Sequence, residues 1–164
     1  MHGHRSTLST VLAVAVFTLA ACNPFHHKPA VEVSTRDANV NSRWHASLVS
    51  PADLAGAVQM SGSASMVPGS SSGNTAVSLR LANASPGGVH PWAVHRGQCG
   101  ADEGVLGPSD AYQPAKVSDD GRAAASATLP LETPTAGSYF VSVRASAANG
   151  ETIIACGNLA PPTQ

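Results

Sequence analysis

In three segments of the chain, apolar side chains occupy every second position, which is a period of two. Residues 77–82 read Val-Ser-Leu-Arg-Leu-Ala, residues 139–144 read Tyr-Phe-Val-Ser-Val-Arg, and residues 122–129 alternate alanine or leucine with mostly polar positions. A period of two sends successive side chains to opposite faces of a β-strand. We therefore predict half-buried strands over these three segments.

Turn residues separate the predicted strands. Clusters of Gly, Pro, Ser, Asn and Asp, which favour tight turns, stand at residues 68–73, 85–88, 119–121 and 149–150. One short helix is expected over residues 51–57, with Ser50 as its N-cap and Pro51 in its first turn. Short strands at regular spacing with glycine-rich turns predict an all-β fold, either a sandwich or a barrel.

The N-terminal segment has the features of an export signal. Residues 8–19 form an apolar run that is too short to span a bilayer, and the run ends in Leu-Ala-Ala-Cys at residues 19–22. This ending is typical of a bacterial lipoprotein, in which Cys22 becomes the N-terminus and carries fatty acyl chains such as palmitate. Two or more acyl chains hold a protein at a membrane without a spanning helix. The alternative is an ordinary secretory signal that is cleaved after Ala21 and leaves Cys22 free.

These features divide the chain into three parts. Residues 1–21 are predicted to be the signal peptide, residues 22–42 a lipid-anchored tether without a sustained apolar period, and residues 43–164 a single β-domain. We expect the protein in the bacterial cell envelope, facing the periplasm or the surface. Asn23, which follows the acylated cysteine, favours the outer membrane over the inner one.

Charge is sparse along the whole chain. Charged residues make up 12% of it, against the usual quarter, and the formal net charge is −1. The sequence contains no run of basic residues, so nucleic acid is not an expected partner. The expected partner is the membrane, through the lipid anchor, and the sequence identifies no protein partner.

Two segments resemble the copper–zinc superoxide dismutase family. Residues 90–99, His-Pro-Trp-Ala-Val-His-Arg-Gly-Gln-Cys, are similar to the strand that carries copper ligands, and residues 153–157, Ile-Ile-Ala-Cys-Gly, are similar to the last strand. The aspartate-glycine hairpin at residues 117–123 adds to the likeness. The resemblance covers residues 86–159, with a more distant likeness to chordin-type domains, and it implies an eight-stranded Greek-key barrel.

The resemblance also implies a disulfide. Of the chain's three cysteines, the predicted lipidation at Cys22 leaves Cys99 and Cys156, which stand where the family has its disulfide cysteines. Export places such a pair in an oxidising compartment, where disulfides persist. The alternative is two unrelated buried thiols.

The metal ligands of the family are largely missing. Aligned on the motif, Ala93 stands at the first copper histidine, His95 at the second and Arg144 at the fourth, while Ile153 replaces the arginine that attracts the anion. The interval between Cys99 and Gly121, where the bridging and zinc ligands belong, contains no histidine. The five carboxylates of that interval are better explained by turn and cap roles. His90 and His95 are expected to have packing roles.

The leading functional hypothesis is therefore a pseudoenzyme, an envelope protein that acts as a structural or binding module with no cofactor and no catalytic residues. His95 and Arg144 could form a small anion-binding spot, or Arg144 could pair with a nearby carboxylate. Two alternatives stay open. One is a divergent dismutase that uses copper at a rebuilt site. The other is a low-affinity metal-binding accessory protein that uses the histidines His26, His27, His45, His90 and His95.

Overall fold

The computed structural model describes residues 42–54, 56 and 59–163, and these residues form an all-β structure. The predicted signal peptide, the lipidation site Cys22 and nearly all of the predicted tether lie outside the described residues. Among those described, there is no helix with the length and apolar character needed to cross a membrane. The elements are β1 (Trp44–Val49), η1 (Ala52–Leu54), β2 (Ser61–Pro68), β3 (Thr75–Ala82), β4 (Val89–His90), β5 (Trp92–Gln98), β6 (Ala101–Val105), η2 (Ser109–Ala111), β7 (Ala115–Lys116), β8 (Ala123–Leu129), β9 (Tyr139–Arg144) and β10 (Ile153–Leu159).

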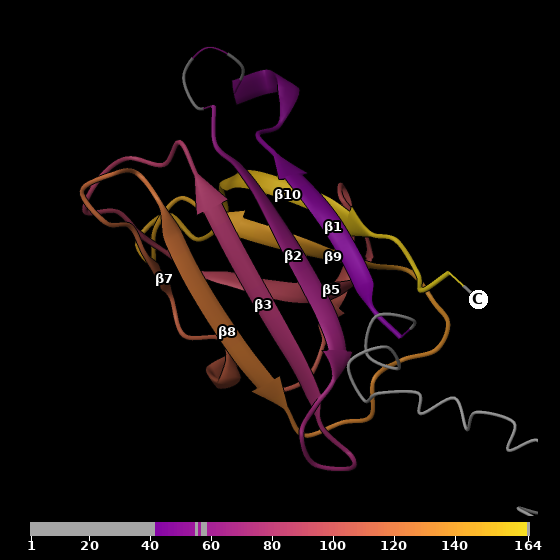
Figure 1. The fold of residues 1–164 in the computed structure, drawn as a ribbon. Coiled ribbons are helices and arrows are strands. Elements are labelled where there is room, and N and C mark those ends of the chain that lie inside the picture. Colours follow the sequence, from indigo (N-terminus) through magenta and orange to yellow (C-terminus); the bar gives the residue numbers. More distant parts are fainter. Residues whose placement is uncertain (1–41, 55, 57–58, 164) are drawn as a thin grey trace, which may run out of the picture. The chain divides into compact units, whose positions relative to one another are not determined.

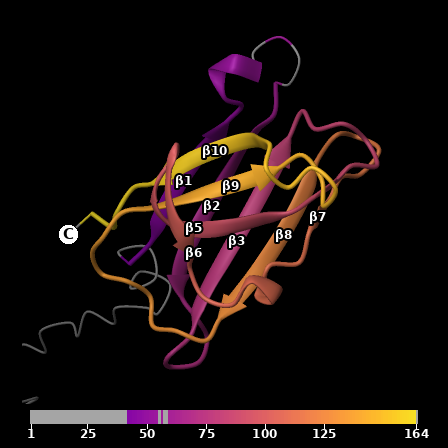
Figure 2. The same cartoon turned by 180° about the vertical axis from the view of Figure 1, so that it is seen from behind.

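Eight strands form one antiparallel sheet in the order β6-β5-β9-β10-β1-β2-β3-β8, and β4 pairs with β7 in a separate two-stranded sheet. The large sheet curls into a half-barrel. The strands β1, β2, β3 and β8 form one side, and β5, β9 and β10 pass behind them at an angle (Figures 1 and 2). The connections from β3 to β5, from β6 to β8 and from β8 to β9 run between strands that are not neighbours in the sheet.

The main core lies inside the curl, between these two sides. Its largest fully buried members from the first side include Trp44, Met66 and Leu79, and Val94 and Val141 come from the other side. The predicted alternation accounts for this placement in β3, where every second residue from Thr75 onward is buried and Ser78 and Arg80 are exposed. All three segments that alternate in the sequence are strands, as predicted. The expectation of a half-buried strand is wrong for β9, because Phe140 and Ser142 on its second face are buried as well.

The expected helix at residues 51–57 is shorter than the sequence suggested. Only a 3₁₀ turn, η1, is present in the described part of this segment, and Leu54 N–H donates to the Pro51 carbonyl. The prediction of Ser50 as an N-cap is wrong. Its hydroxyl bonds to the backbone of Met60 instead, accepting from the Met60 N–H at 3.0 Å. A tertiary contact across the loop has replaced the local cap.

The disulfide predicted between Cys99 and Cys156 is present, with 6.1 Å between the two Cα atoms. It joins the turn between β5 and β6 to the middle of β10. In the chain-entropy model, a bridge across 57 positions stabilises the fold by about 4 kcal/mol. Close backbone packing surrounds it, because a Cβ built at the neighbouring Gly157 would overlap the Ser47 carbonyl of β1.

Candidate functional site

The face of β5 and β9 that points away from the main core carries the residues that the sequence singled out. Ala93 lies opposite Ser142 in the register of these two strands, and His95 lies opposite Phe140. His95 is 2% exposed and its ring stacks on Phe140, with 4.9 Å between ring centroids. Phe140 is fully buried but does not belong to the main core cluster. A second, smaller buried region therefore covers this face.

Both nitrogens of His95 have hydrogen-bond partners. Nδ1 lies 2.9 Å from Oδ1 of Asp102, and Nε2 lies 3.0 Å from Oγ of Ser142. Because an ionised carboxylate only accepts, Nδ1 carries a proton, and Nε2 shares the second hydrogen bond with the serine hydroxyl. The order serine, histidine, aspartate matches that of a hydrolytic triad. Ser142 is 0% exposed, however, so its oxygen is closed to any substrate in this structure.

Asp102 holds this arrangement from the outside. Its Oδ1 also accepts from the N–H of Gly104 at 2.7 Å, and its Oδ2 lies 3.8 Å from the guanidinium of Arg144. Desolvation of Asp102 would raise its pKa, but the hydrogen bonds from Gly104 and His95 and the charges of His95 and Arg144 together lower that pKa below its usual value. Arg144 also donates to the carbonyl of Gly150.

We call His95, Asp102, Ser142 and Arg144 the polar cluster. The structure brings together all three positions that the resemblance assigns to copper ligands, since Ala93, His95 and Arg144 lie on adjacent strands with the polar cluster around them. Between His95 and Arg144, where an anion-binding spot was one possibility, lies the carboxylate of Asp102. Sequence reasoning missed Ser142, although it shares the alternation of Arg144. It also missed the pairing of Asp102 with His95, which depends on an irregular register between β5 and β6.

The other histidines lie apart from this cluster. His90 is 7% exposed and its Nδ1 bonds to the Ala145 carbonyl at 2.9 Å, while its buried Nε2 has no partner among the described residues. His45 is exposed on β1. His26 and His27 lie outside the described residues. Within residues 42–54, 56 and 59–163, no three His, Cys, Asp or Glu side chains are grouped so that they could hold a metal ion.

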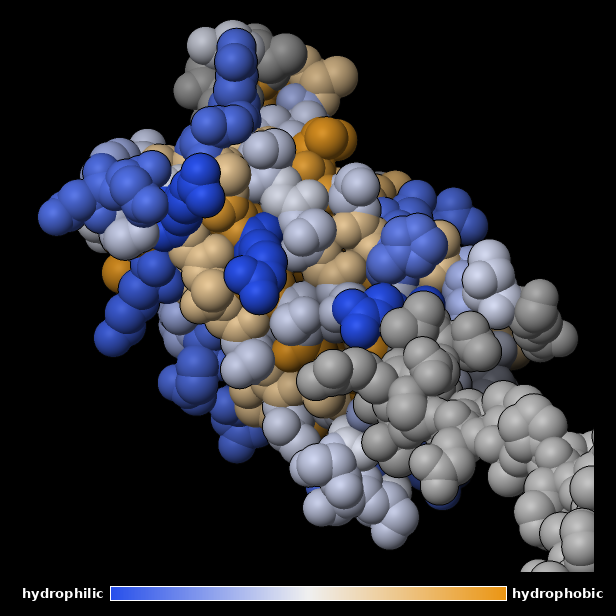
Figure 3. All heavy atoms as spheres, viewed as in Figure 1, coloured by the Kyte–Doolittle hydropathy of each residue, from blue (hydrophilic) through white to orange (hydrophobic). Residues whose placement is uncertain are grey.

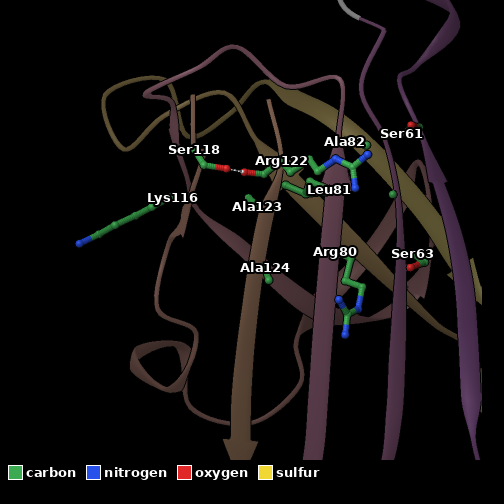
Figure 4. A pocket seen from close by; sticks show the side chains of 11 residues that line it. Ser61, Ser63, Arg80, Leu81, Ala82, Lys116, Ser118, Arg122, Ala123 and Ala124 are labelled. Carbon is green, nitrogen blue, oxygen red and sulfur yellow. Dashed lines mark hydrogen bonds between the residues drawn. The ribbon is translucent and has the colours of Figure 1, made fainter. Parts of the chain in front are cut away.

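A groove of about 580 Å³ lies on the opposite side of the molecule's sheet, on the outer face of β2, β3 and β8. Small pale side chains cover much of this face, and strongly hydrophilic ones rise from it (Figure 3). We call it the basic groove, because its lining includes three cations and, among the described residues, no acid. Its lining residues are Ser61, Gly62, Ser63, Arg80, Leu81, Ala82, Lys116, Ser118, Arg122, Ala123 and Ala124 (Figure 4).

The two arginines of the basic groove are near each other by strand register. Arg80 pairs with Ala124 of β8, and Arg122 stands two residues before Ala124, on the same outer face. Such diagonal positions are about 7–8 Å apart, within reach of long side chains. Both guanidinium groups lie over β3 in Figure 4, whereas Lys116 extends away from them. Sequence reasoning did not identify this site, because the proximity depends on the pairing of β3 with β8.

The internal partners of these cations are few. Arg122 lies 3.8 Å from Asp120, and both side chains are largely exposed, at 76% and 63%. Arg80 and Lys116 form no ion pair within the described part of the chain. The hydroxyl of Ser118 lies 2.5 Å from Oδ1 of Asp120 and 2.8 Å from the Arg122 carbonyl oxygen, so it contacts the turn and the backbone of Arg122 and not its guanidinium group.

Comparison with known proteins adds no relative: no protein-family model matches the chain, and neither does any curated protein.

Proposed function

We propose that the chain is an exported, lipid-anchored protein with a superoxide-dismutase-like Greek-key barrel. In this proposal it lacks dismutase activity and acts as a binding module of the bacterial envelope. The strand order supports the Greek-key part, because long connections join non-neighbouring strands while β1, β2 and β3 follow each other as hairpins. The sequence resemblance over residues 86–159 supports the family.

The observation that best supports the absence of dismutase activity is the set of contacts that His95 makes. Both of its nitrogens have hydrogen-bond partners, Ala93 supplies a methyl group, and Arg144 supplies a fixed positive charge. Copper needs several imidazole or thiolate donors with free lone pairs. The donor set does not fit copper, and the polar cluster serves instead as a structural lock between β5, β6 and β9.

The test compares three proteins after incubation with copper and removal of the excess. We expect the unmodified protein to retain no stoichiometric copper and to dismutate superoxide no faster than buffer. The double variant Ala93→His with Arg144→His should bind copper more tightly, because it adds two imidazoles beside His95. Ala124→His, which adds one imidazole on the outer face of β8, is the control for a histidine placed elsewhere. Tight copper binding with dismutation by the unmodified protein would favour the divergent-dismutase alternative.

The anchor is a separate part of the proposal. Changing Cys22→Ser removes the thiol that receives the lipid, so the variant should be unprocessed or released from membranes into the soluble fraction. Membrane fractionation and mass spectrometry of the N-terminus measure this directly. A variant that stays cleaved, acylated and membrane-bound would exclude the lipoprotein assignment, and inner-membrane recovery of the natural protein would contradict only the outer-membrane expectation.

A further inference from the structure

We propose that the basic groove binds a phosphate monoester, with Arg80 and Arg122 holding the phosphate and the serines of β2 contacting the group that carries it. The inference names a ligand for the binding role proposed above, and in that sense rests on it. The same chemistry could be presented by a soluble sugar phosphate or by a lipid headgroup. The experiment below separates these two sources.

The first support is the unused charge. Arg80 forms no ion pair within the described residues, and Arg122 contacts only the exposed Asp120 at a distance of 3.8 Å. An exposed pair of this length contributes little to stability, because water screens it and both side chains remain mobile. Elsewhere Arg144, the partner of Asp102, is anchored by a carboxylate and a carbonyl. The arginines of the groove therefore have donors to spare.

The second support is the surrounding surface. Arg80 is flanked across the sheet by Ser63 on β2 and Ala124 on β8, and the next outward position on β3 is Ala82. These small side chains leave the guanidinium group uncovered and leave open space over the strands. The hydroxyl of Ser63 has no hydrogen-bond partner among the described residues, so it is available to a ligand oxygen. Figure 4 shows Ser61 and Ser63 on the strand beside the two arginines.

The third support is the match in charge and shape. A guanidinium group presents a planar fork of donors that binds two oxygens of a phosphate at once, and two such groups balance a dianion. A carboxylate has one charge and only two oxygens, so it would leave part of this donor set unused. A groove of about 580 Å³ also leaves room for the organic part of a small phosphate ester. The low overall charge of the chain argues against a long polyanion, which needs an extended basic surface.

The experiment is calorimetric titration of the full chain in a neutral detergent. One arm uses glucose 6-phosphate, with glucose as its uncharged control. The other arm uses dihexanoyl phosphatidic acid, with dihexanoyl phosphatidylcholine as its control. Saturable binding in either arm, absent from the matching control, supports the proposal and identifies the source of the phosphate. Absence of binding in both arms would overturn it.

Variants locate the site. Arg80→Gln and Arg122→Gln should each weaken binding about tenfold, because each removes hydrogen bonds to a charged group, and the double variant should abolish it. Arg96→Gln is the matched control, since Arg96 is an exposed arginine of β5 outside the groove. Unchanged affinity in the double variant would overturn the proposal even if the protein binds phosphate. Copper binding and dismutation are measured separately, so a failure of the ligand proposal and a failure of the non-catalytic proposal give different results.

Discussion

The polar cluster and the basic groove both place arginine beside serine on the outside of the curled sheet, yet their side chains have different surroundings. In the cluster, His95 and Ser142 are buried and Arg144 contacts an internal carboxylate. In the groove, Arg80 is exposed, and among the described residues Arg122 is the one cation of the lining that has a carboxylate nearby. A charge whose partner belongs to the fold is already compensated, and removing that partner leaves it uncompensated. A charge without such a partner is available to a ligand.

The β5–β6 hairpin is the source of this difference. It carries Asp102 over the face of β5 and β9 and so supplies the counter-charge. No comparable hairpin covers the outer face of β2, β3 and β8 among the described residues, and those strands expose short side chains around Arg80. The same residue type thus has a structural role on one face and a proposed recognition role on the other.

The largest expected effect is a contrast in stability between the two regions. His95→Ala should lower the free energy of unfolding by about 3 kcal/mol, because it removes a buried ring that stacks on Phe140 and leaves the Ser142 hydroxyl without its partner. Arg80→Ala should change the same quantity by about 0.5 kcal/mol or less, since exposed side chains without partners contribute little. Chemical denaturation monitored by tryptophan fluorescence measures both.

The stabilities of His95→Ala and Arg80→Ala test whether the polar cluster and the basic groove have different roles. If both variants unfold at the denaturant concentration of the natural protein, the polar cluster is not a structural lock. A large loss in Arg80→Ala would mean that the groove contributes to folding and is not an open recognition surface. A third variant, Arg96→Ala, measures how much the free energy of unfolding changes when an exposed arginine is removed from β5.

Local patterns predicted much of the fold, and non-local geometry accounts for the rest. The alternation at residues 77–82 identifies β3 because a strand in a half-buried sheet must alternate its side chains. Cys99 and Cys156 could be paired from their neighbours and the expected compartment. The contact between Asp102 and His95 could not, because it needs the register shift at Gly97, whose φ is +93°. A side chain at Gly97 would meet the Ala101 carbonyl, so glycine is required there.

The sequence identifies the polar cluster in part, but it does not identify the basic groove. Ala93, His95 and Arg144 could be placed on one site because a resemblance aligns them, and the structure gathers them on adjacent strands. Arg80 and Arg122 converge only because β3 pairs with β8, which follows in the chain after several intervening strands. Alternation gives the face of a strand but not its neighbour in the sheet. The basic groove therefore could not be inferred before the strand order was known.

The smallest expected effect is a difference in melting temperature between variants of two aspartates, Asp102 and Asp120, and its dependence on pH. Partial desolvation would raise the pKa of Asp102, but Gly104, His95 and Arg144 lower it. The hydrogen bond from Ser118 is the main cause that lowers the pKa of Asp120. A carboxyl whose folded pKa is depressed stabilises the folded state above its unfolded pKa of about 3.9, and this contribution is lost as the pH falls through the folded value. At neutral pH, Asp102→Asn should therefore lower the melting temperature more than Asp120→Asn. Asp102 bonds to a buried histidine, whereas Asp120 orders an exposed turn.

As the pH falls below the folded pKa values, both carboxyls become neutral in the natural protein, so its melting temperature should approach those of the two variants. Melting curves recorded from neutral pH down into this acid range test the sign as well as the order. A deficit of Asp102→Asn that stays constant down to acid pH would show that the ionised carboxylate is not what stabilises the polar cluster. Equal deficits for the two variants at neutral pH would remove the energetic distinction between the polar cluster and the exposed turn that carries Asp120.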